Sequence, residues 1–185
     1  MDRRLHEIED GLGRELGAFL GSVNFSGYSD RERLRSDDLA VRSVASQEVL
    51  VAKNAVSEAI SAWWRDAAGE PTREQPFPKP EVNHKLRELR AFEQSLADLE
   101  SAIRSAPAPD IDAVWNRRSD GAQVLNELLA LDKALLESSR RLADSAHGIS
   151  ASTLADVEPF ASLRAPLSDL QSVSEQRKRL IANAR

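Results

Sequence analysis

The chain has 185 residues, of which 41% are hydrophobic and 30% are charged, a balance typical of one soluble domain with a single core. It contains no cysteine, which excludes disulfides, thiolate zinc sites and thiol nucleophiles. The net charge of -5 disfavours a general nucleic-acid binder, because sequence-independent affinity for phosphate needs a positive surface. The charged first residues and the lack of a long apolar run lead us to expect a cytoplasmic protein without a signal peptide or membrane span.

The first predicted helix covers residues 5–23, where apolar side chains recur at spacings of three and four. Three glycines spaced four apart form one ridge of this helix, although each interior glycine costs about 1 kcal/mol relative to alanine. We interpret the ridge as a place where another backbone approaches closely. The alternative is a helix that stays frayed until something binds it. The predicted contact residues of this helix are Gly13, Gly17, Gly21, Leu16 and Phe19.

Attachment of this helix to a membrane surface is a second interpretation. Helices that lie on anionic membranes usually carry Lys and Arg on the polar face. Here the polar face holds more acidic than basic residues: Asp2, Glu7, Glu9, Asp10 and Glu15 against Arg3, Arg4 and Arg14. This acidic balance disfavours membrane binding.

A long second helix is predicted from about residue 30 to residue 68. Ser29 and Glu32 match a capping box at its start. Trp63 continues the apolar stripe, whereas Trp64 points about 100° away and must meet a second surface. That surface is the following linker, another helix or a partner, because tryptophan is common both in cores and among interface hot spots.

Prolines separate this helix from the next one. Residues 69–80 hold four of them and form a connection, after which Pro80 suits the first position of a third helix. A heptad pattern follows, with apolar residues at Val82, Leu89, Leu96 and Ile103. The pattern stops at residues 106–110, where Asp110 can cap a fourth helix. Because this connection is short, we expect an antiparallel hairpin over about 81–147 whose two helices pack side by side.

The last third of the chain is predicted from its glycines and prolines. The fourth helix has a possible kink at residues 119–121 and ends with Gly148 as a left-handed cap. Pro159 and Pro166 divide the remainder into a short turn and a last helix. We interpret the basic stretch in that helix as an exposed last turn that faces the negative end of the helix dipole, with nucleic-acid contact as the alternative. Its basic residues are Arg177, Lys178 and Arg179.

Two histidine pairs have the spacing that holds metals in di-iron bundles, but they do not predict a metal site. Glu81 with His84 and Asp144 with His147 are i, i+3 pairs. Both pairs lie near helix ends, and a hairpin turn near residue 108 would place the histidines roughly 22 Å apart along the helices. The glycines at 11, 13 and 17 do not follow a strand, so they do not predict a dinucleotide site either.

The sequence therefore predicts a single all-α domain over residues 1–185, an elongated helical bundle or antiparallel coiled coil of about five helices. Its parts are a helix pair (1–68), a proline-rich connection (69–80), a hairpin (81–147) and a helical segment (149–185). We expect a non-enzymatic interaction protein without cofactor or metal, an adaptor, scaffold or assembly component that self-associates or binds a protein through the glycine ridge and through Trp63 and Trp64. The alternatives are a peripheral membrane protein and a ligand- or metal-binding bundle, which would need polar groups that the apolar stripes almost lack.

Overall fold

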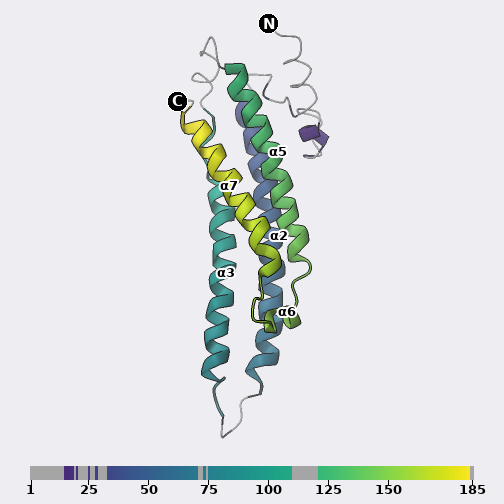
Figure 1. Ribbon diagram of the computed structural model, residues 1–185, viewed down its shortest axis with the longest axis vertical. Coiled ribbons are helices and arrows are strands. Elements are labelled where there is room, and N and C mark those ends of the chain that lie inside the picture. The colour runs from purple at the N-terminus through teal and green to yellow at the C-terminus, as the bar shows by residue number, and fades with distance from the viewer. Residues whose placement is uncertain are drawn as a thin grey trace.

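The computed structural model describes residues 15–18, 20, 25, 28, 33–70, 73, 75–109 and 121–183, and this part of the chain is all helix and connection (Figure 1). It contains four long helices and one short one, besides a helical turn at residues 15–18, and no strand. The helices are α2 (Leu34–Ala68), α3 (Pro80–Arg104), α5 (Gly121–Ala146), α6 (Ala151–Ala155) and α7 (Ala161–Asn183). The all-α bundle predicted from the apolar spacing is confirmed.

The long helices alternate in direction along one axis, so the bundle is elongated (Figure 1). α2 is the longest at 35 residues, about 52 Å at 1.5 Å per residue. It packs against α3, α5 and α6, while α5 also packs against α7. No described helix is long and apolar enough to cross a membrane.

α2 starts later than the sequence indicates. Its N-cap is Arg33, which makes no side-chain capping bond. The predicted capping box therefore does not begin this helix, and both Ser29 and Glu32 lie outside the described residues. The acidic side chain that supports the first turn is Asp37, which accepts a hydrogen bond from the backbone N–H of Tyr28 at 3.4 Å.

The predicted hairpin is antiparallel, but its helices are not each other's main neighbours. α3 and α5 run in opposite directions (Figure 1), yet α3 packs mainly on α2, and α5 packs on both α2 and α7. The reason is the connection: α3 ends at Arg104 and α5 begins at Gly121. A connection of this length can join two helices that are not neighbours in a bundle. The expectation that the two helices pack side by side, which assumed a short connection, therefore does not apply here.

α3 follows its predicted heptad closely. Pro80 occupies the first turn as expected, after Lys79 at the N-cap. Leu89, Leu96 and Ile103 are buried, and Leu99 is buried on the complementary positions. The buried seam faces α2 because a spacing of 3.5 residues keeps one stripe on a neighbouring helix.

Two predictions about the last third of the chain are wrong. Gly148 does not have a positive φ, because turn bonds from its own N–H and from that of Ile149 end α5 without a left-handed residue. The glycine with a positive φ is Gly69, at the C-cap of α2, where φ is 66°. Pro166 does not begin the last helix but lies inside α7, where it costs one backbone hydrogen bond while buried Leu163 anchors the turn before it.

Three aromatic side chains form part of the core. The rings of Phe92 and Phe160 stack with centroids 3.9 Å apart, which joins α3 to the start of α7. Trp63 is buried at the end of α2, and the Lys85 ammonium lies over its ring at 5.9 Å. We call Trp63, Phe92 and Phe160 the aromatic layer.

Candidate functional site

Charged side chains occupy core positions on three helices of the bundle. On α5 and α7 the buried positions repeat at alternating spacings of four and three, the pattern of a coiled-coil seam. The α5 seam is Leu128, Asp132, Leu135, Ser139, Leu142 and Ala146, and the α7 seam is Leu163, Leu167, Leu170, Ser174, Arg177 and Ile181. On α2 the corresponding stripe includes Asp38 between Leu34 and Val41. The expectation that the stripes almost lack polar groups is therefore wrong.

These charges meet in one connected group, which we call the charged layer: Asp38 and Arg42 of α2, Asp132 of α5 and Arg177 of α7. Arg177 Nε donates to Asp132 Oδ1 at 2.6 Å, and its Nη2 donates to Asp38 Oδ1. Arg42 donates to Asp38 Oδ2 from Nε at 2.9 Å and from Nη2 at 2.7 Å. Arg42 Nη1 also donates to the carbonyl oxygen of Arg104, so the layer reaches the end of α3.

Tyr28, in the segment that precedes α2, binds the charged layer with its side chain. Its hydroxyl donates to Asp132 Oδ2, and its side chain is fully buried. Phe25 packs edge-on against its ring, with centroids 5.8 Å apart. Tyr28 has φ 62°, a left-handed conformation that costs a non-glycine residue energy and persists only where surrounding contacts hold it.

The electrostatics of the layer keep Arg177 charged. Burial alone would lower its pKa, but Asp132, Tyr28 and Asp38 outweigh that effect and raise the pKa above its ordinary value. Burial raises the pKa of Asp132, and the Arg177 guanidinium opposes this rise. Burial, and then the nearby Asp132 carboxylate, raise the pKa of the Tyr28 hydroxyl well above 10. The phenol therefore stays protonated as the donor to Asp132.

The carboxylates of the charged layer find all their hydrogen-bond partners within the chain. Each carboxylate oxygen of Asp38 and Asp132 accepts at least one hydrogen bond from a layer residue or Tyr28. In the layer, the buried side-chain atom without a partner is Arg177 Nη1. Among the described residues, no group of three or more His, Asp or Glu side chains could hold a metal. This geometry fits a structural role for the layer, since no ligand oxygen remains open.

A small pocket lies at the surface of α5, away from these buried charges. Its volume is about 180 Å³, below the usual range for ligand sites. Lys133 forms an ion pair with Glu15 beside it, and both side chains are partly exposed. The residues that line the pocket are Glu15, Leu16, Lys133, Leu136 and Glu137. We assign no ligand to it.

The residues predicted to contact a partner lie mostly within the fold where the structure describes them. Leu16 and Trp63 are buried, and Gly17 is half-buried. Trp64 is half-buried and packs against the same core. Gly13, Phe19 and Gly21 lie outside the described residues.

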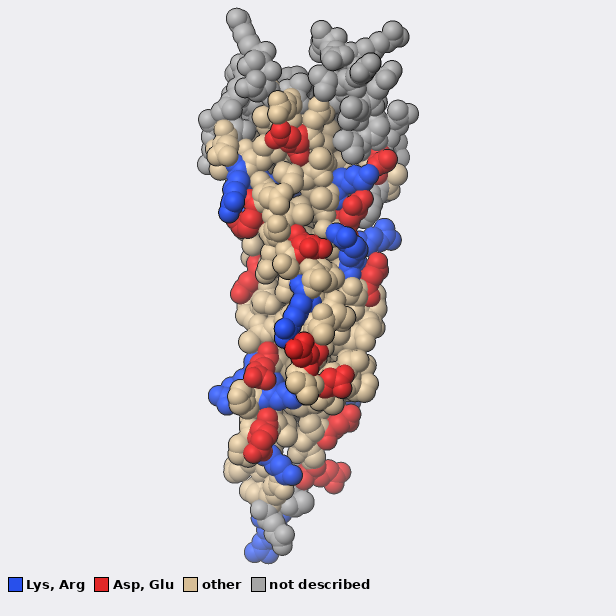
Figure 2. All heavy atoms as spheres, viewed as in Figure 1, with Lys and Arg blue, Asp and Glu red and all other residues tan. Residues whose placement is uncertain are grey.

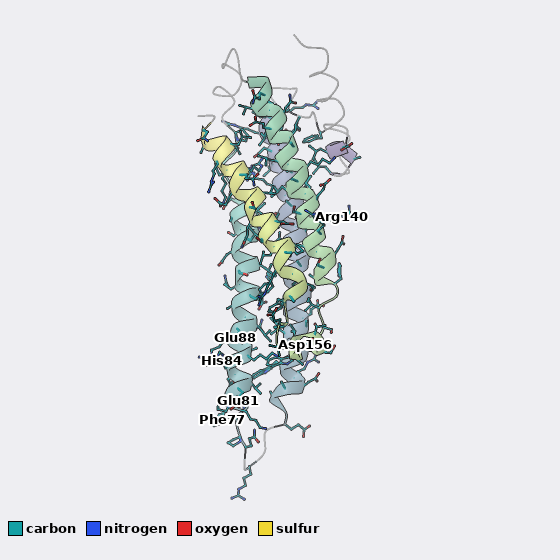
Figure 3. All side chains as sticks on the ribbon, in the orientation of Figure 1. Phe77, Glu81, His84, Glu88, Arg140 and Asp156 are labelled. Carbon is teal, nitrogen blue, oxygen red and sulfur yellow. The ribbon has the colours of Figure 1, made fainter. Side chains whose placement is uncertain are left out.

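Both histidine pairs are on the surface. Glu81 and His84 are exposed near one end of α3, where Figure 3 also shows Glu88 and Phe77. His84 Nδ1 lies 3.7 Å from Glu88 Oε1, an exposed pair on one helix. Asp144 and His147 are exposed at the end of α5. Next to His84 in the sequence, Lys85 donates to the carbonyl oxygens of Ala155 and Asp156 at 2.8 and 2.9 Å.

The interpretation of residues 177–179 as a basic last turn is wrong, because α7 continues to Asn183 and its last turn holds no basic residue. Arg177 is moreover buried. Its side chain is 2% exposed, whereas Lys178 and Arg179 are on the outer side of α7. The spacing of four and three through Leu170, Ser174 and Arg177 could have indicated this position. The sequence offered no direct sign of the two aspartates on other helices that neutralise it.

The exposed face of α2 differs from the faces of its neighbours because it carries no charge over a long stretch. Between Arg35 and Glu58 the exposed residues are Ser36, Leu39, Ser43, Gln47 and Asn54, and all the charged residues in this interval are buried or half-buried. Leu39 is 57% exposed. The exposed residues of α3 and α5 instead include many charges, and the face shown in Figure 2 mixes both signs along its length. We call this stretch, residues 36–54 on the outer side of α2, the α2 face.

Comparison with known proteins adds no relative to this description: no family model, no curated protein and no solved structure matches the chain.

Proposed function

We propose that the protein is a non-enzymatic helical interaction protein, an adaptor, scaffold or assembly component that self-associates through helix–helix contacts. The observation that carries the proposal is the uncharged α2 face with Leu39 exposed on it. In a chain with 30% charged residues, solvent-facing helix positions are normally charged, as on α3 and α5. A helix stripe of about 27 Å without exposed charge can pack on another helix without desolvating ions.

The charged layer supports the same proposal indirectly. Its ion pairs and hydrogen bonds are formed within the chain, which leaves the outer surface of α2 as the feature without an internal explanation. A buried charged group also gives the bundle one preferred register, a role attested for polar residues in coiled coils. A fixed register holds the α2 face in a single orientation, which is what an assembly component requires.

The proposal is tested by the mass of the protein in solution over a range of concentrations, measured by light scattering. We expect an oligomer whose fraction rises with concentration. Leu39→Glu should lower that fraction, because it places a charge on the α2 face. Phe77→Glu is the matched control: it also replaces an exposed apolar residue (77% exposed) by Glu, but it lies in the connection between α2 and α3 (Figure 3).

Both results against the proposal are clear. A chain that stays monomeric at every concentration would contradict self-association. An oligomer that Leu39→Glu and Phe77→Glu affect equally would place the contact away from the α2 face. Circular dichroism of each variant would check that the helices remain folded.

A further inference from the structure

We infer that α3 is a displaceable helix, and that its seat on α2 is a binding site for an amphipathic helix of the same chemistry from a partner protein. This inference goes beyond the proposed use of the α2 face. α3 lies along one side of the bundle (Figure 1) and, among the described helices, packs extensively on α2 alone. The other long helices are joined without it, because α5 packs on both α2 and α7.

The charged layer holds α2, α5 and α7 together when α3 leaves. Arg177 of α7 pairs with Asp38 of α2 and with Asp132 of α5, and none of these residues belongs to α3. The layer binds α3 through Arg42, which donates to the carbonyl oxygen of Arg104. Departure of α3 breaks that bond but leaves the two Asp and two Arg side chains of the layer paired with one another, so no unpaired charge is left in the core.

α3 also contributes less to the core than its neighbours do. Its buried residues are four of 25, against six of 23 in α7 and thirteen of 35 in α2. Because buried apolar surface is the main favourable term in packing, α3 is the long helix among these three that detaches at the lowest cost. Its connections allow this movement, since residues 69–79 precede it and residues 105–120 follow it, and long connections are cheap to rearrange.

The seat on α2 specifies the chemistry of its occupant, because α3 fills it in this structure. The occupant needs apolar side chains at a spacing of 3.5 residues, as Leu89 and Leu96 supply in α3. It also needs an acidic side chain at the position of Glu93, whose carboxylate interacts with Ser57 of α2. The partner class that fits is therefore an amphipathic helix recognised by its apolar heptad, with a carboxylate near its middle.

A fluorescent peptide with the α3 sequence, Pro80–Arg104, tests the seat on the full chain. We expect the peptide to bind at a rate that reaches a plateau as its concentration rises, because α3 must open first. The control is the same peptide with serine at three buried positions, which should not bind. These positions are Leu89, Leu96 and Ile103.

A pair of lysine variants tests whether the opening of α3 limits that rate. Lys85→Met should raise the plateau rate about tenfold, because Lys85 holds α3 to the carbonyl oxygens of Ala155 and Asp156. Lys133→Met is the matched control: it also removes an ammonium group, but one that pairs with Glu15 on α5, and it should leave the rate unchanged.

Hydrogen exchange of the free chain separates the opening of α3 from global unfolding. Leu136→Ala weakens α5 beside Leu16, and α5 does not pack extensively on α3. It should speed exchange in α5 and α7 roughly a hundredfold and leave α3 unchanged, because α3 opens without disturbing that contact. Equal acceleration in α3 would mean that it opens only by global unfolding, and would overturn the inference.

Two results with the peptide would also overturn the inference. One is the absence of binding, or equal binding by the serine peptide. The other is binding that Leu39→Glu abolishes, which would place the peptide on the α2 face and leave the proposed self-association standing.

Discussion

The two halves of the bundle are held together by different chemistry. At the end where α2 begins and α7 ends, the helices meet through the charged layer and Tyr28. Toward the opposite end they meet through the aromatic layer, with Lys85 binding the backbone at the end of α6. The charged layer is directional, because each hydrogen bond needs a specific partner. The aromatic layer gains free energy mainly from buried area.

This difference teaches where stability and where specificity come from in the fold. Apolar seams of the kind on α3 tolerate slippage by a heptad, because one leucine resembles another. Arg177 does not tolerate it, since a shift of α7 by one turn would take its guanidinium away from Asp38 and Asp132. We therefore expect the charged layer to set the register of the helices and the aromatic layer to add stability without setting it.

The largest expected effect is the removal of one charge from the charged layer. Arg177→Met leaves the Asp132 carboxylate buried with Tyr28 alone, and loss of one partner of a buried ion pair typically costs about 3–5 kcal/mol. Urea unfolding followed by circular dichroism measures this loss. The double variant Arg177→Met/Asp132→Leu should recover most of it, because the remaining Asp38–Arg42 pair is neutral. If the double variant were as unstable as the single one, charge pairing would not explain the layer.

The contrast between the layers also shows how far the sequence could predict this protein. The helical fold and the α3 heptad were predictable, because apolar spacing reports directly which face is buried. The charged layer was not, because a lone Asp or Arg on a stripe becomes favourable only beside an opposite charge from another helix. Arg177 stands next to two other basic residues, so local composition pointed to the surface while its seam position pointed to the core.

The sequence predicted other contact residues than those of the proposed α2 face. Trp63 and Trp64 resemble interface residues in composition, but both pack within the chain. The α2 face escaped notice for the opposite reason: serine, alanine and glutamine are unremarkable in sequence. Its lack of exposed charge is visible only once the buried positions of Asp37, Asp38 and Arg42 are known.

A smaller effect is expected in the aromatic layer. Phe160→Ala removes a buried ring that stacks on the half-buried Phe92, and we expect a loss of about 3 kcal/mol in the free energy of unfolding. Phe160→Leu should cost much less, since most of the buried apolar area is kept. Neither loss should depend strongly on salt. Urea unfolding at low and high salt checks both statements, and a cost for Phe160→Leu equal to that of Phe160→Ala would show that stacking, not buried area, holds this end.

The smallest effect is a dependence of stability on alkaline pH that arises from Tyr28 beside the charged layer. Burial raises the pKa of Tyr28, so the folded chain keeps this proton above pH 10 while the unfolded chain releases it. The contribution is therefore fully present below pH 10 and is lost as the pH rises, by up to about 1.4 kcal/mol for each pH unit. Thermal unfolding between pH 8 and pH 11 measures the slope.

Two controls make this slope specific to Tyr28. Tyr28→Phe should be less stable at pH 8, because Asp132 loses a donor, but its stability should fall less steeply above pH 10. Tyr28 is the sole tyrosine of the chain, so the ultraviolet absorbance of tyrosinate reports on this residue alone. We expect that signal to rise together with the loss of helical circular dichroism, because the phenol ionises once it leaves the charged layer. A tyrosinate signal that rises near pH 10 in a fully helical protein would mean that the hydroxyl is open to solvent. The helices around the charged layer would then stay packed without the Tyr28 hydrogen bond.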